Sequence, residues 1–144
     1  MKHLMNHLIM NIKVMSFNCG GFNPQKGLHS VKNMKINQIQ AKCDILLLQE
    51  TWLTKQETKL LPGSIPGFIG TGVATVDASD GLITSHPPGG VAIFYRNNLS
   101  SYVSIIDTKL DWVTGIQFCK NNISIYIFPY TYLVVITKMK IIIY

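Results

Sequence analysis

Two stretches of sequence decide the fold: IKVMSFNCGG at residues 12–21 and CDILLLQETW at residues 43–52. Each contains a short, mostly apolar run that ends in polar or glycine residues, which is typical of a strand that enters a turn. The run Ile45–Leu48 is continuously apolar, as expected of a strand covered on both faces. Between the two stretches, Ser30 can cap a helix over Val31–Lys42. The spacing therefore predicts a strand, a helix and a second, parallel strand in one βαβ unit.

The carboxyl ends of these two strands carry the strongest candidates for chemistry. Parallel strands place those ends on one edge of a sheet, where open α/β sheets hold their sites, so Asn18 and Glu50 should lie on the same edge. Glu50 presents a carboxylate, and magnesium often needs only one or two carboxylates together with a substrate phosphate. Asn18 offers an amide that can orient a phosphate, and Gly20-Gly21 could turn backbone N–H groups toward one. From the residues alone, the alternatives are a solvated strand end for Glu50 and an ordinary turn asparagine for Asn18.

The chain changes character after Glu50. Lys55–Leu61 favours a short helix, and Thr71–Gly90 has the composition of a long loop. Four closely spaced apolar segments follow, which predict strands of one antiparallel meander. These segments are Val91–Arg96, Tyr102–Ile106, Trp112–Phe118 and Asn122–Phe128. The chain is therefore expected to be an α+β sandwich.

Composition and charge narrow the classes of function. The 144 residues are 47% hydrophobic and 14% charged, which excludes a disordered tail. The formal net charge is +6, and eight lysines face only three acids up to Leu60. This basic first half favours a polyanionic partner such as nucleic acid, with a solvated lysine-rich surface as the alternative. Arg96 is the only arginine, so a base-reading surface built on bidentate arginines is not expected.

Other types of site find little support. The cysteines lack a C-x-x-C pair, so neither a zinc site nor a disulfide framework is indicated. No histidine falls at a predicted strand end beside a carboxylate, and each is expected at the surface. Residues 1–10 lack the cleavage site of a signal peptide, and no run approaches the length of a membrane span. We therefore expect an intracellular protein of the nucleus or cytoplasm.

The two opening stretches together resemble the endonuclease/exonuclease/phosphatase superfamily, in which the first strand ends in Asn and the second in an L-Q-E-T motif. The later segment Gly89–Arg96 is similar to the glycine-led strand in the endonuclease domain of non-LTR, LINE-type retrotransposons. Asp111–Ile116 and Ile123–Tyr130 resemble the strands that follow it, in the same order. The resemblance extends over Asn11 to Tyr130.

The resemblance implies roles for three residues. Glu50 would bind the catalytic magnesium or manganese, and Asn18 would lie in the phosphate-binding site. A tyrosine in a Y-x-P motif contacts the scissile phosphate in this family, and Tyr126 is the candidate here. The match is imperfect, because Tyr126-Ile127-Phe128-Pro129 is one residue longer than that motif, or else Phe128 replaces the tyrosine.

The resemblance also implies elements that these residues do not contain. The family's D-x-N and S-D-H motifs are missing, because the last acid is Asp111 and the last histidine is His86. We therefore expect residues 11–130 to be the truncated N-terminal half of a DNase I-like, four-layer α/β/β/α sandwich. Residues 1–10 would be an extension and residues 131–144 an unmatched tail. The implied function is a magnesium-dependent DNA endonuclease domain of a retrotransposon, inactive alone, with DNA as its partner and with no membrane and no small-molecule cofactor.

Two other functions remain open from the sequence. One is a non-catalytic remnant that binds nucleic acid or protein through the basic first half. The other keeps the superfamily but changes the substrate to a phosphoinositide or sphingomyelin, against which the segment Gly89–Arg96 argues.

Overall fold

The computed structural model describes residues 11–81, 86–121, 123–129 and 134–137 as two four-stranded sheets with short helices. The first sheet has the strand order β1-β2-β4-β3 and the second the order β5-β6-β7-β8. The strands are β1 (Val14–Asn18), β2 (Ile45–Gln49), β3 (Phe68–Val73), β4 (Val91–Arg96), β5 (Val103–Ile106), β6 (Gly115–Lys120), β7 (Ile123–Pro129) and β8 (Val134–Thr137). The helices are α1 (Met34–Gln40) and α2 (Lys55–Thr58), and the 3-10 turns are η1 (Ala78–Asp80) and η2 (Asn97–Tyr102).

The first sheet is built around β2. This strand pairs in parallel with β1, which confirms the predicted βαβ unit, and antiparallel with β4. The side chains of Ile45–Leu48 are fully buried. Burial of each such side chain stabilises the fold by about 1.5–3 kcal/mol, so this one strand anchors both faces of the sheet.

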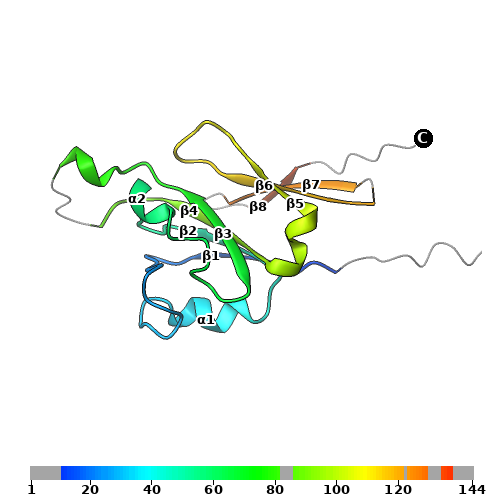
Figure 1. Cartoon of the computed structure of the whole chain (residues 1–144), viewed down its shortest axis with the longest axis horizontal. Helices are drawn as coiled ribbons and strands as arrows, with labels where there is room; N and C mark the ends of the chain where they lie inside the picture. Colours follow the sequence, from blue (N-terminus) through cyan, green and yellow to red (C-terminus); the bar gives the residue numbers. More distant parts are fainter. Residues whose placement is uncertain (1–10, 82–85, 122, 130–133, 138–144) are drawn as a thin grey trace, which may run out of the picture.

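The two faces of β2 belong to two hydrophobic cores. Leu46 and Leu48 pack with Ile36 of α1, whereas Ile45 and Leu47 pack against the second sheet. Figure 1 shows the result as layers, with α1 on one side of the first sheet and strands β5–β8 on the other. The expected fold class is confirmed, and the described residues supply three layers of the expected four, α/β/β.

The second sheet is an antiparallel meander, with β5 to β8 paired in chain order. The predicted meander is wrong in its first member, because Val91–Arg96 is β4 of the first sheet, where it pairs with β2 and β3. The last strand of the second sheet lies inside the segment that was expected to be an unmatched tail, because Val134–Thr137 pairs with Tyr126–Pro129 of β7. Residues 1–10 and the rest of that tail lie outside the described residues. Among the helices that the structure describes, none combines the length and the apolar character needed to cross a membrane.

The prediction of a loop over Thr71–Gly90 is wrong in its first part, because Phe68–Val73 forms the edge strand β3. Two glycines concealed this strand, since glycine usually weakens strands. Here they are required. A Cβ at Gly70 would lie 2.4 Å from Cε1 of Phe94, and a Cβ at Gly72 would lie 2.6 Å from the backbone oxygen of Val91. Close packing of β3 therefore explains a sequence that is typical of a loop.

Helix α1 is shorter than predicted, because residues 31–33 form a turn and the helix begins at Met34. The expected cap, Ser30, accepts a hydrogen bond from Asn33 N at 3.3 Å and so holds this turn. The single arginine binds backbone carbonyls at and beyond the carboxyl end of the helix. Arg96 donates from Nη2 to the carbonyl of Gln40, the last residue of the helix, at 3.1 Å, and so satisfies a carbonyl that the helix leaves unpaired. It also donates from Nε to the Cys43 carbonyl beyond the helix at 3.0 Å.

Candidate functional site

The carboxyl ends of β1 and β2 meet on one edge of the first sheet, as predicted. Asn18 pairs in register with Gln49, and Glu50 follows directly. The amino end of the antiparallel neighbour β4 reaches the same edge, where Val91 pairs with Gln49. The edge therefore gathers Asn18, Glu50 and the two glycines that precede β4. The structure brings the first two predicted site residues together, while their chemical roles stay predictions.

The Glu50 carboxylate is half-buried and held through one of its oxygens. Oε2 accepts a hydrogen bond from Gly89 N at 3.1 Å and another from Trp52 Nε1 at 3.3 Å. Oε1 accepts none from any part of the chain that the structure describes. One oxygen is thus fixed in direction, and the other is left for a cation or for water.

The backbone around Glu50 adopts an unusual conformation. Glu50 and Trp52 have positive φ angles of 53° and 56°. Such left-handed conformations cost side-chain-bearing residues about 1–3 kcal/mol each and cluster at functional sites. The turn is secured by Thr51 N donating to Gly90 O at 3.2 Å and by Trp52 N donating to Gly89 O at 3.0 Å. This turn directs the carboxylate and the indole toward the same side of the edge, where they form their hydrogen bond.

Between these two residues, Thr51 is fully buried, and its hydroxyl has no hydrogen-bond partner among the described residues. A Cβ at Gly90 would lie 2.4 Å from this hydroxyl oxygen. The φ of Gly90, 85°, also favours glycine. The glycine pair before β4 is therefore part of the site, since Gly90 leaves room for the turn and Gly89 donates to the carboxylate.

Asn18 is exposed, and its Oδ1 accepts a hydrogen bond from Gly20 N at 3.2 Å. This hydrogen bond is the one expected of an ordinary turn asparagine, the alternative that the sequence leaves open for Asn18. It also orients the side chain, because its amide nitrogen is left with no partner among the described residues and can donate to a phosphate oxygen. The glycine amides are not available in the same way. Gly20 N is used by Asn18, and Gly21 N donates to the Glu50 carbonyl at 2.9 Å.

Cys19 lies beside this edge, half-buried, with its thiol 3.3 Å from the Gln49 carbonyl oxygen. Burial raises the pKa of the Cys19 thiol to about 11. At pH 8 only roughly one thiol in a thousand would then be ionised, and the thiolate is the reactive form. Cys19 is therefore a packing residue and not a nucleophile.

This pKa predicts an order of alkylation. Iodoacetamide at pH 8 should label the exposed Cys119 first and leave Cys19 unmodified, and the rate at Cys19 should rise about tenfold per pH unit between pH 8 and pH 10. Peptide mass mapping of the labelled native protein measures both rates. Labelling of Cys19 as fast as Cys119 under native conditions would contradict the burial of its thiol.

His86 is exposed, as the sequence predicts, and its ring also lies against the site. Its ring stacks on the Trp52 indole, with ring centres 4.9 Å apart and planes inclined by 14°. Trp52 in turn bonds to Glu50, so the stack lies next to the carboxylate. No spacing signal in the sequence links His86 to Trp52, because the two residues are far apart in the chain and only the fold brings their rings together.

Tyr126 lies elsewhere in the fold. It is on β7 of the second sheet, paired with Gln117 and Thr137. Its neighbour Ile127 is buried in the core between the sheets, and successive side chains of a strand point to opposite faces. Tyr126 therefore belongs to the outer face of the second sheet. The structure does not bring it together with Asn18 and Glu50, and its role as a phosphate contact stays a prediction.

This edge can bind a divalent metal ion only through a single carboxylate. The described residues contain no group of three or more histidine, cysteine or acidic side chains that could enclose an ion. Magnesium, however, retains several waters and is often held by one or two carboxylates together with a substrate phosphate. Glu50, with its free Oε1, meets that requirement.

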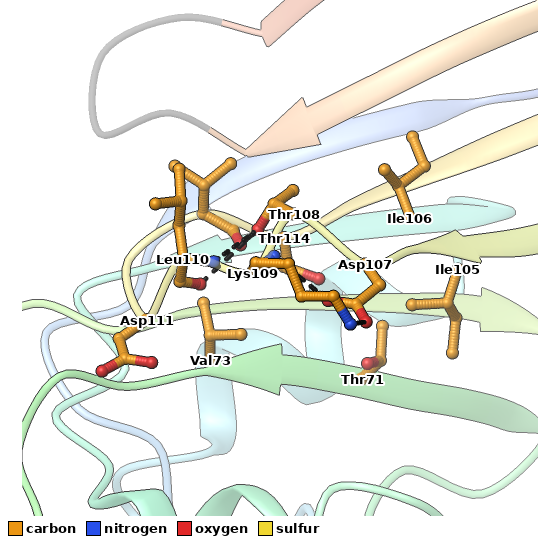
Figure 2. Close-up of a pocket in the computed structure, with 11 residues that line it drawn as sticks. Thr71, Val73, Ile105, Ile106, Asp107, Thr108, Lys109, Leu110, Asp111 and Thr114 are labelled. Atoms are coloured by element: carbon orange, nitrogen blue, oxygen red, sulfur yellow. Dashed lines mark hydrogen bonds and ion pairs between the residues drawn. The ribbon is translucent and has the colours of Figure 1, made fainter.

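A separate pocket of about 370 Å³ opens where the two sheets meet, beside this edge. Figure 2 shows Thr71 and Val73 of β3 facing the loop between β5 and β6 across this pocket. Neither Asn18 nor Glu50 lines it. The loop is held by ion pairs, with Lys109 bound to Asp107 and Lys55 bound to Asp111 at 2.7 Å. The side chains that line this pocket are not arranged to bind and polarise a phosphate. The candidate site remains the edge that gathers Asn18, Glu50, Gly89 and Gly90, which we call the Glu50 edge.

Comparison with known proteins finds a family whose sequence model matches most of the chain. The sequence model of the endonuclease/exonuclease/phosphatase family matches residues 15–132. No curated protein matches the chain. Among solved structures, the chain is similar to the catalytic domain of human Nocturnin, solved with a bound sulfate anion, with 18% identity and a TM-score of 0.45. That similarity covers 81% of this chain and 48% of the other, so the chain spans about half the length of that domain.

Proposed function

Because this chain belongs to the endonuclease/exonuclease/phosphatase family, we propose that its Glu50 edge is the metal- and phosphate-binding part of a magnesium-dependent phosphodiesterase site. One observation carries the proposal. Glu50 directly follows the buried strand β2, and its carboxylate is fixed through Oε2 by Gly89 and Trp52. Its Oε1 is left without a hydrogen-bond partner among the described residues. A carboxylate that is held in direction and half desolvated is suited to a hard cation.

Each residue of the edge would have a separate role in binding the metal or the phosphate. Glu50 would hold magnesium or manganese, which, when bound, neutralises charge that develops on a phosphate. The Asn18 amide would donate a hydrogen bond to a phosphate oxygen and so position the phosphodiester beside the cation. Trp52 and Gly89 would orient the carboxylate. Cys19 takes no part, because its thiol stays protonated.

We propose DNA as the substrate class and a non-LTR retrotransposon endonuclease as the origin. Two features support this finer assignment. The glycine pair before β4, which is similar to the glycine-led strand of those enzymes, contributes directly to the site through Gly89. The antiparallel strands β6 and β7 then follow in the order that the resemblance implies. D-x-N and S-D-H codons in the genomic sequence downstream of the codon for Tyr144 would support this origin.

The 144 residues contain no D-x-N or S-D-H sequence. In the family these motifs orient and deprotonate the attacking water. Catalytic groups of this kind act as a unit, so their absence should remove nearly all of the rate. We therefore propose that these residues alone bind a metal and a phosphodiester without hydrolysing it.

Nicking of supercoiled plasmid tests this proposal. With magnesium, the chain and its Glu50→Ala variant should both give background levels of open-circular DNA, a ratio of about one, because neither contains a base for the attacking water. Gel densitometry measures the products. Nicking by the unmodified chain that disappears in Glu50→Ala would overturn the proposed inactivity.

A second candidate function is binding of nucleic acid without catalysis. It is favoured by the lysines of the loop between β1 and α1, which form no ion pair among the described residues. Salt-dependent binding of DNA that survives the loss of the Glu50 carboxylate would favour this candidate.

A further inference from the structure

The pair Asp80-Gly81, at the end of η1, differs from every other aspartate position in the chain. It is the only Asp-Gly pair in the sequence, and no asparagine is followed by glycine. A glycine after an aspartate lets the main chain bend back toward the aspartate side chain, because glycine has no Cβ to obstruct the approach. This pair is therefore where a backbone nitrogen can most easily reach the preceding carboxyl group.

The Asp80 carboxylate is also unrestrained. Among the described residues it forms no hydrogen bond and no ion pair, and the residue is exposed. Each of the other four aspartates accepts at least one hydrogen bond; these are Asp44, Asp77, Asp107 and Asp111. The Asp80 side chain can therefore turn toward the amide that follows it without breaking a contact.

The amide of Gly81 is equally free to move. Its N–H donates to no acceptor in the parts of the chain that the structure describes, and a Cβ built on Gly81 would meet no atom within 4 Å. Its φ of 131° and ψ of −164° lie in a region that is essentially restricted to glycine. The backbone bond that holds Asp80 runs from its own N–H to the Asp77 carbonyl at 3.2 Å. This bond precedes the reacting atoms and can stay intact while they rotate.

We propose that Asp80 is a site of spontaneous covalent modification, at which the chain converts aspartate to isoaspartate. The Gly81 nitrogen attacks Cγ of Asp80, and the new C–N bond closes a five-membered succinimide ring. The hydroxyl of the carboxyl group leaves with the amide proton as water. Solvent water then opens the ring, and cleavage of the original peptide C–N bond gives isoaspartate. One water leaves and one returns, so the step needs no other reactant.

The product has a changed main chain at this point. The backbone runs through the former side chain and is one methylene group longer, and a free α-carboxylate projects from it. Such a carboxylate is a substrate for enzymes that transfer a methyl group from S-adenosylmethionine to isoaspartyl residues. The modified chain would therefore be recognised by that class of methyltransferase, and the unmodified chain would not.

The structure contains a comparison site three residues upstream. The Asp77 carboxylate accepts hydrogen bonds from Ser79 N at 2.9 Å and from Gln56 Nε2 at 2.6 Å. The amide that follows, Ala78 N, donates to Gln56 Oε1 at 3.0 Å. The hydrogen bonds from the Ser79 hydroxyl and amide, and then that from Gln56, lower the pKa of the Asp77 carboxyl to about 2. Water leaves only from a protonated carboxyl, so both reacting groups are restrained at Asp77 and free at Asp80.

Ageing of the native protein at neutral pH and physiological temperature tests the proposal. Isoaspartate is measured by methyl transfer from labelled S-adenosylmethionine and is located by fragmentation mass spectrometry of the peptides. The signal should grow with time at Asp80 and not at the other four aspartates. Asp80→Glu should abolish it, because glutamate would have to close a larger ring. The matched control Asp107→Glu, at another exposed aspartate, should leave the signal unchanged.

A second variant separates the effect of the structure from that of the sequence. Ala78→Gly creates another Asp-Gly pair at Asp77, where two sets of hydrogen bonds must open before the ring can close. In the native protein isoaspartate should form there at least about fivefold more slowly than at Asp80, and in urea the two rates should be equal. Absence of isoaspartate at Asp80, equal rates at both pairs in the native protein, or a difference that persists in urea would overturn the proposal.

Discussion

Glu50→Gln should abolish the terbium luminescence that Trp52 sensitises. Terbium is a hard cation that prefers oxygen ligands, as magnesium does, and it emits when a nearby indole transfers excitation to it. The Trp52 indole lies within hydrogen-bonding distance of the Glu50 carboxylate, so an ion on Oε1 would be close to an efficient donor. Glutamine keeps the shape and removes the only carboxylate of the site. The expected loss of affinity is on the order of 100-fold, which corresponds to about 2.7 kcal/mol.

Three control variants make this titration decisive. Asp80→Asn removes the same charge from η1 and should leave the titration unchanged. Trp112→Phe removes the other tryptophan, which is 60% exposed, and should leave the sensitised signal in place. Trp52→Phe should lose the signal while calorimetry still detects terbium, because the carboxylate remains. Undiminished terbium binding by Glu50→Gln would refute the metal site.

How far the sequence predicts this molecule depends on how local each feature is. The run Ile45–Leu48 and the glycines after Asn18 specify β1, β2 and their shared edge, because burial pattern and turn chemistry are local properties. Asn18 and Glu50 could be predicted as site residues because both stand where these two strands end. The pairing of β5, β6 and β7 is likewise predicted from short apolar segments at close spacing, whereas Val91–Arg96, expected in the same meander, pairs in the first sheet.

What the sequence does not predict depends on contacts between distant segments. The strand β3 has the sequence of a loop, because its glycines are explained only by close contacts with β4: the ring of Phe94 beside Gly70 and the Val91 carbonyl oxygen beside Gly72. The hydrogen bond from Gly89 to the Glu50 carboxylate and the stack of His86 on Trp52 join segments that are distant in the sequence. The positive φ angles of Glu50 and Trp52 are equally invisible, since neither residue type favours that conformation.

Phe94→Ala should be the most destabilising truncation of the first core, with an expected cost of about 3–5 kcal/mol. Phe94 is fully buried on β4, and its ring meets Phe22 edge to face with centres 5.7 Å apart. It also packs onto Gly70, where β3 has no side chain. The surrounding groups cannot all collapse into the space, because strand β3 and the loop that follows β1 are tied by their own backbone hydrogen bonds.

Urea unfolding followed by tryptophan fluorescence measures this loss, with Val31→Ala as the control. Val31 is 86% exposed, so its truncation should change the free energy of unfolding by less than about 0.5 kcal/mol. Because Phe22 follows the glycine turn at Asn18, the same variant should also loosen the site edge. Terbium affinity should therefore fall in Phe94→Ala under conditions where the protein is still folded, and it should not change in Val31→Ala. A midpoint for Phe94→Ala equal to that of the control would mean that α1 and the first sheet do not pack around this ring.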